Sequence, residues 1–259
     1  MEFKNVFILK RYKNPKYNII LLHGFISSKN IFEKIINNIN ITNANYYAFD
    51  YEEMIIKNKS KLIFESFPEQ LLEFVKKYNL DNIILVAHSM GGGVASLSYS
   101  SLKDKIKKIV LISPLSRSVL ISKAGITFFN GTVTNRIKII RNTLFSKKNQ
   151  DNEYSTDIYI MNDYERFLKE KSKHIELGLS LISLTRLNKV MNCYKTIEQP
   201  TLILLGKDDK IIPGSTAKHE FEKMKKDNFQ IILWENVGHV SWIENFEQFK
   251  ETFSEFINK

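Results

Sequence analysis

The stretch that decides the fold is residues 82–93, which read NIILVAHSMGGG. Its first half is a continuous apolar run, which predicts a strand buried on both faces of a sheet. The second half sets Ser89 among small residues, including Gly91, and continues into a segment suited to a helix. A serine in a sharp turn between a strand and a helix is typical of a nucleophile elbow. The strained backbone of that turn exposes the serine hydroxyl at the edge of the sheet. Small neighbours are needed because the strand and helix backbones pass close together there.

Strand and helix patterns alternate on both sides of this stretch. The predicted strands are 6–9, 17–22, 46–49, 83–86, 108–112, 201–205 and 230–234. The predicted helices beside them are 30–39, 66–78, 90–101, 215–226 and 246–257. Such alternation predicts an α/β fold with a mainly parallel central sheet and helices on both faces. A length of 259 residues, 43% of them hydrophobic, suits one large folded domain.

One interval, residues 115–199, is far longer than a single crossover helix requires. It contains helical patterns at 159–171 and 175–187. We therefore expect a core made of 1–114 and 200–259, with 115–199 inserted as a helical cap, or lid, over the edge of the sheet that presents Ser89. The alternative is a helical excursion that only stabilises the sheet edge.

The predicted strand 17–22 is followed by His23, Gly24 and Phe25. A glycine at this point allows a tight turn that aims a main-chain N–H inward. The N–H groups of Phe25 and Met90 would then hold the negative oxygen of a tetrahedral intermediate, an oxyanion hole. We expect His23 to support this loop and to transfer no proton.

Two further strand ends carry the remaining groups that an activated serine needs. The segment after 201–205 contains Asp208 and Asp209, and both qualify chemically as the carboxylate that orients a histidine. After 230–234 comes Gly238-His239, in a loop that can reach the serine. The order Ser, Asp, His is one known order of the catalytic triad.

At these residues the chain resembles the α/β-hydrolase superfamily, over essentially its whole length. The resemblance rests on His23-Gly24-Phe25, on 87–91, on the Gly-x-x-Asp motif with a following proline at Gly206, Asp209 and Pro213, and on Gly238-His239. It implies that Ser89 is the nucleophile, His239 the general base and Asp209, rather than Asp208, its orienter. It also implies that the inserted segment is the helical cap of the family.

The chain departs from the family pattern at two places. Ala87 stands where the elbow usually has glycine, a form that some bacterial lipases share. The glycine-rich, arginine-containing loop that many members carry after the strand near Asp50 is replaced by residues 50–54, DYEEM. Because that loop borders the substrate entrance, the chemistry is better defined than the substrate.

These motifs predict a serine hydrolase that cleaves carboxylic esters through an acyl-enzyme. The expected substrate is a small-molecule ester, with an acyl lipid as one candidate. A thioesterase or a carbon–carbon bond hydrolase remains an alternative, because the motifs report the mechanism and not the leaving group. A non-catalytic binding protein on the same fold is the other alternative.

Composition restricts the partners. The formal net charge is +10, but the lysines are scattered and form only short pairs. This pattern predicts a solvated basic surface, no nucleic-acid partner and at most weak peripheral membrane contact. The first residues lack a secretory pattern and Cys193 is the only cysteine, so we expect a cytoplasmic protein. No metal-ligand spacing or phosphate loop occurs, so we expect no metal and no cofactor. The sequence predicts no particular oligomeric state.

The other histidines have expected structural roles. We expect the side chain of His88 to turn away from the elbow into the packing beside it. His174 and His219 lie in helical patterns, and we expect both to be solvated at the surface.

Overall fold

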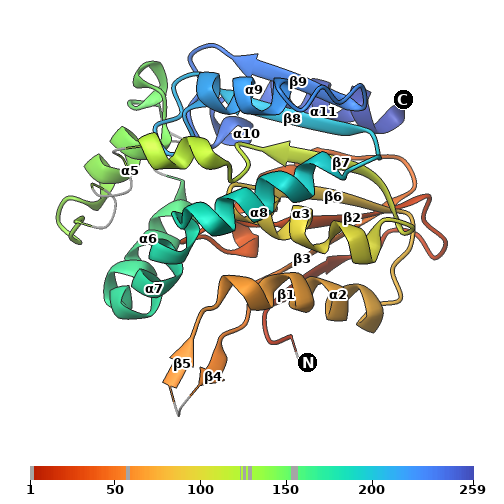
Figure 1. Cartoon of the computed structure of the whole chain (residues 1–259), viewed down its shortest axis with the longest axis horizontal. Helices are drawn as coiled ribbons and strands as arrows, with labels where there is room; N and C mark the ends of the chain where they lie inside the picture. Colours follow the sequence, from red (N-terminus) through yellow and green to blue (C-terminus); the bar gives the residue numbers. More distant parts are fainter. Residues whose placement is uncertain (1–2, 57–58, 123, 125–126, 128–129, 153–156) are drawn as a thin grey trace.

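A seven-stranded sheet forms the centre of the computed structural model, which describes residues 3–56, 59–122, 124, 127, 130–152 and 157–259. The strand order is β1-β3-β2-β6-β7-β8-β9 (Figure 1). The strands are β1 Val6–Leu9, β2 Tyr17–Leu22, β3 Ala44–Phe49, β6 Ile83–His88, β7 Ile106–Ile112, β8 Thr201–Gly206 and β9 Phe229–Trp234. Only the pairing of β1 with β3 is antiparallel within this described sheet. The predicted α/β fold with a mainly parallel sheet is therefore confirmed.

Helices cover both faces of the sheet. One face carries α2 Phe67–Lys77, α3 Met90–Leu102, α8 Leu184–Lys195 and α9 Gly214–Glu222. The other carries η1 Lys29–Phe32, α1 Glu33–Asn38, α10 Ser241–Glu244 and α11 Phe246–Asn258. Successive strand residues point to opposite faces, so Leu85 and Ala87 pack in the first core while Ile84 and Val86 pack in the second. All six residues of β6 are buried, as a strand covered on both faces requires.

The described residues between β7 and β8 form helical elements. In chain order these are η3 Arg117–Ile121, α5 Arg136–Leu144, η4 Lys147–Asn149, α6 Ile158–Lys169, α7 Lys171–Leu181 and α8. Figure 1 shows α6 and α7 beyond one end of the sheet, whereas α8 lies alongside α3. Asp157 caps α6 by accepting hydrogen bonds from the main-chain N–H groups of Tyr159 and Ile160.

The prediction of one helix at 175–187 was wrong. The segment contains the end of α7 and the start of α8, separated at Ile182 and Ser183. Ser183 is extended, with φ −68° and ψ 119°, so the chain changes direction there although the apolar pattern continues. The short hairpin of β4 Met54–Ile56 and β5 Lys59–Lys61, together with α5, was not predicted.

In the part of the chain that the structure describes, no helix combines the length and apolar character needed to cross a membrane.

Candidate active site

Ser89 occupies a sharp turn between β6 and α3. Its backbone has φ 52° and ψ −119°, a left-handed conformation that costs energy for any residue but glycine. Two hydrogen bonds hold the turn to the end of β7, because Ser89 N donates to Ile112 O and Leu115 N donates to Ser89 O. The strained turn predicted from the sequence is therefore present at Ser89.

Gly91 lets α3 start directly beside the end of β2. A Cβ atom at position 91 would lie 2.3 Å from Leu22 O and 2.9 Å from His23 O, which are main-chain atoms that cannot give way. A side chain is thus excluded there by backbone contact.

His239 and Asp209 meet at the same edge of the sheet. Nδ1 of His239 lies 2.7 Å from Oδ2 of Asp209, and both side chains are buried. A carboxylate oxygen accepts hydrogen bonds, so Nδ1 of His239 is the donor, and in the neutral ring this tautomer leaves the lone pair on Nε2. The other carboxylate oxygen accepts from the N–H groups of Ile211 and Ile212, each at 2.8 Å. Of the two aspartates left open by residue chemistry, Asp209 makes the histidine contact.

Ser89 and His239 line the same cavity, which has a volume of about 130 Å³ and mostly apolar walls. We call it the apolar cavity. Its further lining comes from the loop after β2, from the start of α3, from η3 and from the helices of the insert, including Phe25, Met90, Val119, Ile160, Tyr164 and Leu181. Phe25 and Met90, the predicted main-chain donors, thus face the same space as the serine.

Gly24 brings the loop after β2 close to the elbow. A Cβ atom at position 24 would lie 3.0 Å from Ser89 Cβ and 3.1 Å from Nδ1 of His88. Ile26, two residues later, has φ 53°, so the loop turns sharply around the serine. His23 is buried and its Nδ1 is 2.9 Å from Gly24 O, a contact within the loop.

The loop that carries His239 is held by two groups for which the sequence predicted no such role. Nε2 of His88 donates to His239 O at 3.1 Å, and the His88 ring packs between His239 and Trp242. His88 is thus buried in the packing beside the elbow, as expected, and it also lines the apolar cavity, which was not predicted. Burial lowers the pKa of His88 well below its ordinary value, so its ring is neutral.

Glu244 is the second supporting group. Its carboxylate accepts from the main-chain N–H groups of Gly238 and Ser146 and from Nδ2 of Asn149. Burial raises the pKa of Glu244 above its ordinary value, and these hydrogen bonds make the increase smaller. The available sequence signal was a carboxylate directly after Trp242 and Ile243, because an acid beside large apolar residues is a candidate for burial and a buried acid needs specific donors.

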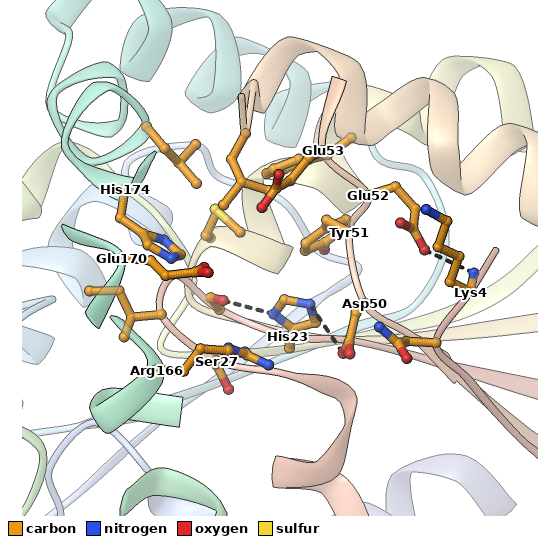
Figure 2. Close-up of a pocket in the computed structure, with 17 residues that line it drawn as sticks. Lys4, His23, Ser27, Asp50, Tyr51, Glu52, Glu53, Arg166, Glu170 and His174 are labelled. Carbon is orange, nitrogen blue, oxygen red and sulfur yellow. Dashed lines mark hydrogen bonds and ion pairs between the residues drawn. The ribbon is translucent and has the colours of Figure 1, made fainter. Parts of the chain in front are cut away.

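A second cavity, which we call the polar cavity, lies on the other side of the loop after β2 and has a volume of about 350 Å³. Figure 2 shows His23 and Tyr51 at its centre, with Arg166, Glu170 and His174 entering from α6 and α7. His174 is half-buried, and burial lowers its pKa. The expectation that His174 is solvated was wrong, because α7 packs it against Phe25 and Phe167. His219 is exposed, as predicted.

Within the described residues, no group of three or more His, Cys, Asp and Glu side chains is placed to hold a metal ion.

Comparisons with known proteins agree with this architecture. A family model described as the alpha/beta hydrolase fold matches residues 17–246. A Mycoplasma pneumoniae protein named "Putative esterase/lipase 1" is 25% identical over 98% of this chain and 95% of its own length.

Solved structures are similar at the level of the fold. An esterase from Exiguobacterium antarcticum superposes with a TM-score of 0.73 at 18% identity, covering 98% of this chain and 95% of that one. A meta-cleavage product hydrolase from Pseudomonas fluorescens IP01 gives a TM-score of 0.74 at 17% identity, covering 98% and 93%.

Proposed function

Because the chain belongs to the α/β-hydrolase fold family, we propose that it is a serine hydrolase that cleaves carboxylic esters through Ser89, His239 and Asp209. The observation that carries the proposal is the orientation of His239. Its Nδ1 is hydrogen-bonded to Asp209. The basic Nε2 therefore lies on the side of the ring away from the carboxylate, where it can accept a proton. Ser89, in a strained turn, lines the same cavity as that ring.

In the proposed mechanism, the Ser89 hydroxyl attacks the acyl carbonyl while Nε2 of His239 takes its proton. The N–H groups of Phe25 and Met90 stabilise the oxyanion, an effect worth a few kcal/mol for each donor. His239 then gives the proton to the leaving alcohol, and water cleaves the acyl-enzyme with His239 again as the base. Gly24 and Gly91 support this arrangement by permitting the close approach of the two loops.

We assign residues 115–199 the role of a cap in this proposal. Described residues of α6 and α7, including Ile160 and Leu181, form part of the wall of the apolar cavity. Nine large apolar side chains are exposed in the described part of the chain, and all lie between Leu120 and Leu184. Ile182 belongs to this group and also lines the apolar cavity. An apolar cavity bordered by exposed apolar residues supports an acyl chain as the part of the ester that it holds.

The test is covalent labelling with a fluorophosphonate probe, followed by mass spectrometry of the modified peptide. We expect the probe on Ser89 and no labelling of Ser89→Ala. Ser101→Ala is the matched control, because Ser101 is an exposed serine in α3, the helix that Ser89 precedes, and its loss should leave labelling intact. An unlabelled natural-sequence protein would contradict the proposal.

A substrate series then separates the ester hydrolase from its alternatives. Esters of rising acyl length should be cleaved, and Ser89→Ala should lower kcat at least about 10³-fold. A large preference for the thioester over the ester of the same acid would favour a thioesterase. Labelling of Ser89 without ester or thioester cleavage would favour a carbon–carbon bond hydrolase.

A further inference from the structure

We propose that the polar cavity is the subsite for the alcohol part of the ester, and that it takes a neutral alcohol with several hydroxyl groups. The inference rests on the proposed function and adds a substrate class to it. The substrate would then be an ester with an apolar acyl group and a hydroxylated alcohol, divided between two cavities of opposite character.

The two cavities share part of their lining beside the reacting serine. Ile26, Ser27 and Met90 line both of them, and Gly24, next to Ser89, lines the polar one. Met90 also supplies one of the proposed oxyanion donors. An ester carbonyl held there lies at the junction, so its acyl and alcohol parts extend in different directions. The apolar cavity suits the acyl part, which leaves the polar cavity for the alcohol.

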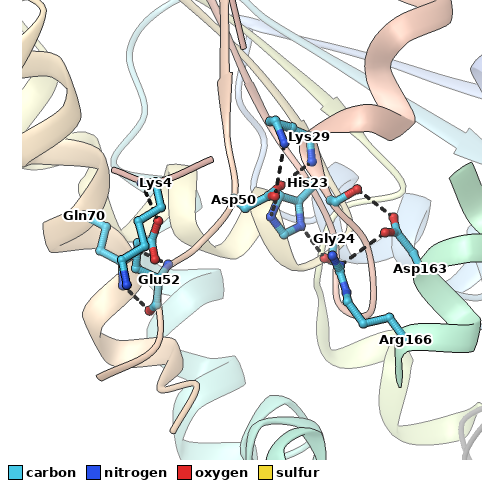
Figure 3. Close-up of polar contacts among 10 residues, drawn as sticks. Lys4, His23, Gly24, Lys29, Asp50, Glu52, Gln70, Asp163 and Arg166 are labelled. Carbon is cyan, nitrogen blue, oxygen red and sulfur yellow. Dashed lines mark hydrogen bonds and ion pairs between the residues drawn. The ribbon is translucent and has the colours of Figure 1, made fainter. Parts of the chain in front are cut away.

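Most charged groups around the polar cavity have charged partners within the protein. The ion pairs are Asp50 with Lys29, Glu53 and Glu170 with a shared Lys173, and Arg166 with Asp163, while the Glu52 carboxylate accepts a hydrogen bond from the main-chain N–H of Lys4 (Figure 3 draws the contacts of Asp50, Glu52 and Arg166). A cationic or anionic ligand would therefore compete with these contacts. A neutral ligand meets no such cost.

Four side chains that line the polar cavity carry a buried polar atom with no hydrogen-bond partner among the described residues. These atoms are Tyr51 Oη, His23 Nε2, His174 Nδ1 and Ser27 Oγ. Buried polar atoms are nearly always hydrogen-bonded, so a cluster of four calls for an outside partner. Figure 2 shows all four residues around one space.

The protonation of these groups matches hydroxyl chemistry. Nδ1 of His23 donates to Gly24 O, and burial lowers the pKa of His23, so Nε2 is an acceptor. It lies 3.9 Å from Oδ1 of Asp50, too far for a hydrogen bond, and both atoms are acceptors. Burial raises the pKa of Tyr51, which keeps its O–H as a donor. The cavity thus presents both an acceptor and a donor. Hydroxyl groups suit it because a hydroxyl can donate to the one and accept from the other.

The test compares kcat/KM for two esters of the same acid, glyceryl monobutyrate and propyl butyrate. The natural protein should prefer the glyceryl ester by about tenfold or more, since a site built for hydroxyl groups discriminates against an analogue that lacks them. Tyr51→Phe should lower the ratio of the two values about tenfold. This variant should fold, because it removes only a hydroxyl without a partner.

His174→Phe is the second variant, because it keeps the ring packing against Phe25 and Phe167 and removes the nitrogens. It should lower the same ratio. Tyr78→Phe is the matched control, since Tyr78 lies outside both cavities, and it should keep the ratio of the natural protein.

The outcomes separate this inference from the function on which it rests. Ester cleavage with equal kcat/KM for the two alcohols would overturn the inference and leave the hydrolase intact. A ratio unchanged in both Tyr51→Phe and His174→Phe would also overturn it. A preference for butyrylcholine over glyceryl monobutyrate would overturn the inference that the alcohol is neutral and would favour a cationic alcohol. Absence of both labelling at Ser89 and ester cleavage would overturn the proposed function itself.

Discussion

Nδ1 of His239 donates a 2.7 Å hydrogen bond to Oδ2 of Asp209, whose other oxygen accepts from two main-chain N–H groups in the turn after β8. The turn thus fixes the carboxylate, and the carboxylate fixes the tautomer of the imidazole. Asp208, its neighbour in sequence, is only half-buried, and its main-chain N–H bonds to Val237 O. Two adjacent aspartates therefore have different environments, and this difference is directly testable.

Asp209→Asn should lower kcat by about 10³- to 10⁴-fold, because an amide at this position can hold His239 in the wrong tautomer. The measurement is steady-state hydrolysis of a short-chain ester. Asp208→Asn is the control and should retain kcat within about twofold, because Asp208 makes no contact with His239 that would be lost. An equal loss in both variants would contradict the assignment of Asp209.

Asp163 should make stability depend on pH. Burial raises its pKa to about 6, although Arg166 and the Ser28 hydroxyl lower it. Between about pH 4 and 6 the folded chain keeps a proton that the unfolded chain has lost, so this carboxyl destabilises the fold as the pH rises. Asp163→Asn should remove this pH-dependent loss of stability. Relative to the natural protein, the variant should gain up to about 3 kcal/mol above pH 6 and nothing near pH 4.

Urea unfolding at pH 4.5, 6 and 7.5 measures this difference. Asp151→Asn is the control from the same segment, because the Asp151 side chain is 98% exposed. The Asp151 variant should follow the natural protein at every pH. Identical pH slopes for the Asp163 variant and the natural protein would contradict the raised pKa.

Gly91→Ala should destabilise the protein by about 3 kcal/mol or more, because the new methyl meets main-chain atoms of β2. Gly93→Ala is the control in the same helix. Its methyl would meet only side-chain atoms of Phe64 and Leu115, at 3.0 and 3.1 Å. The gain in helix propensity, up to about 1 kcal/mol, is the same for both. Thermal unfolding should therefore separate the two variants by several degrees, and equal Tm values would contradict the contact at Leu22.

Glu244→Ala should lower both stability and kcat. It leaves the N–H groups of Gly238 and Ser146 without their acceptor, at a cost of about 3 kcal/mol. Gly238 precedes His239, so the general base loses a support of its loop. Glu247→Ala is an exposed control and should change neither quantity appreciably. Loss of stability with an unchanged kcat would show that Glu244 has no part in positioning His239.

Much of the sheet edge could be predicted from the sequence. Apolar runs mark the strands, and parallel strands joined by right-handed crossovers bring their carboxyl ends to one edge. Ser89, Asp209 and His239 each follow such a run within a few residues. Local pattern and topology together were therefore sufficient to place these three residues near one another.

Other parts of the site depend on contacts that no local pattern reports. The apolar period continues through Ile182, so the break between α7 and α8 gave no signal. His174 has the sequence surroundings of a surface residue, and only the docking of α7 against the loop after β2 half-buries it. The Tyr51 ring is held in position by stacking on Phe67, with ring centroids 4.3 Å apart. Such neighbours are set by tertiary packing and not by the period of one element.

The two ends of the long insert are attached to the same short piece of the molecule. At its start, Leu115 N bonds to Ser89 O, and at its end Tyr194 of α8 donates to Leu115 O while α8 packs along α3. Both attachments thus share one anchor at the nucleophile turn. A second anchor lies at the end of α5, where His239 N donates to Leu144 O and Ser146 N donates to Glu244. Any hinged motion of α6 and α7 is therefore limited by both anchors. A crosslink between α6 and the core would consequently restrict substrate entry, whereas one between α8 and α3 would join parts that already move together.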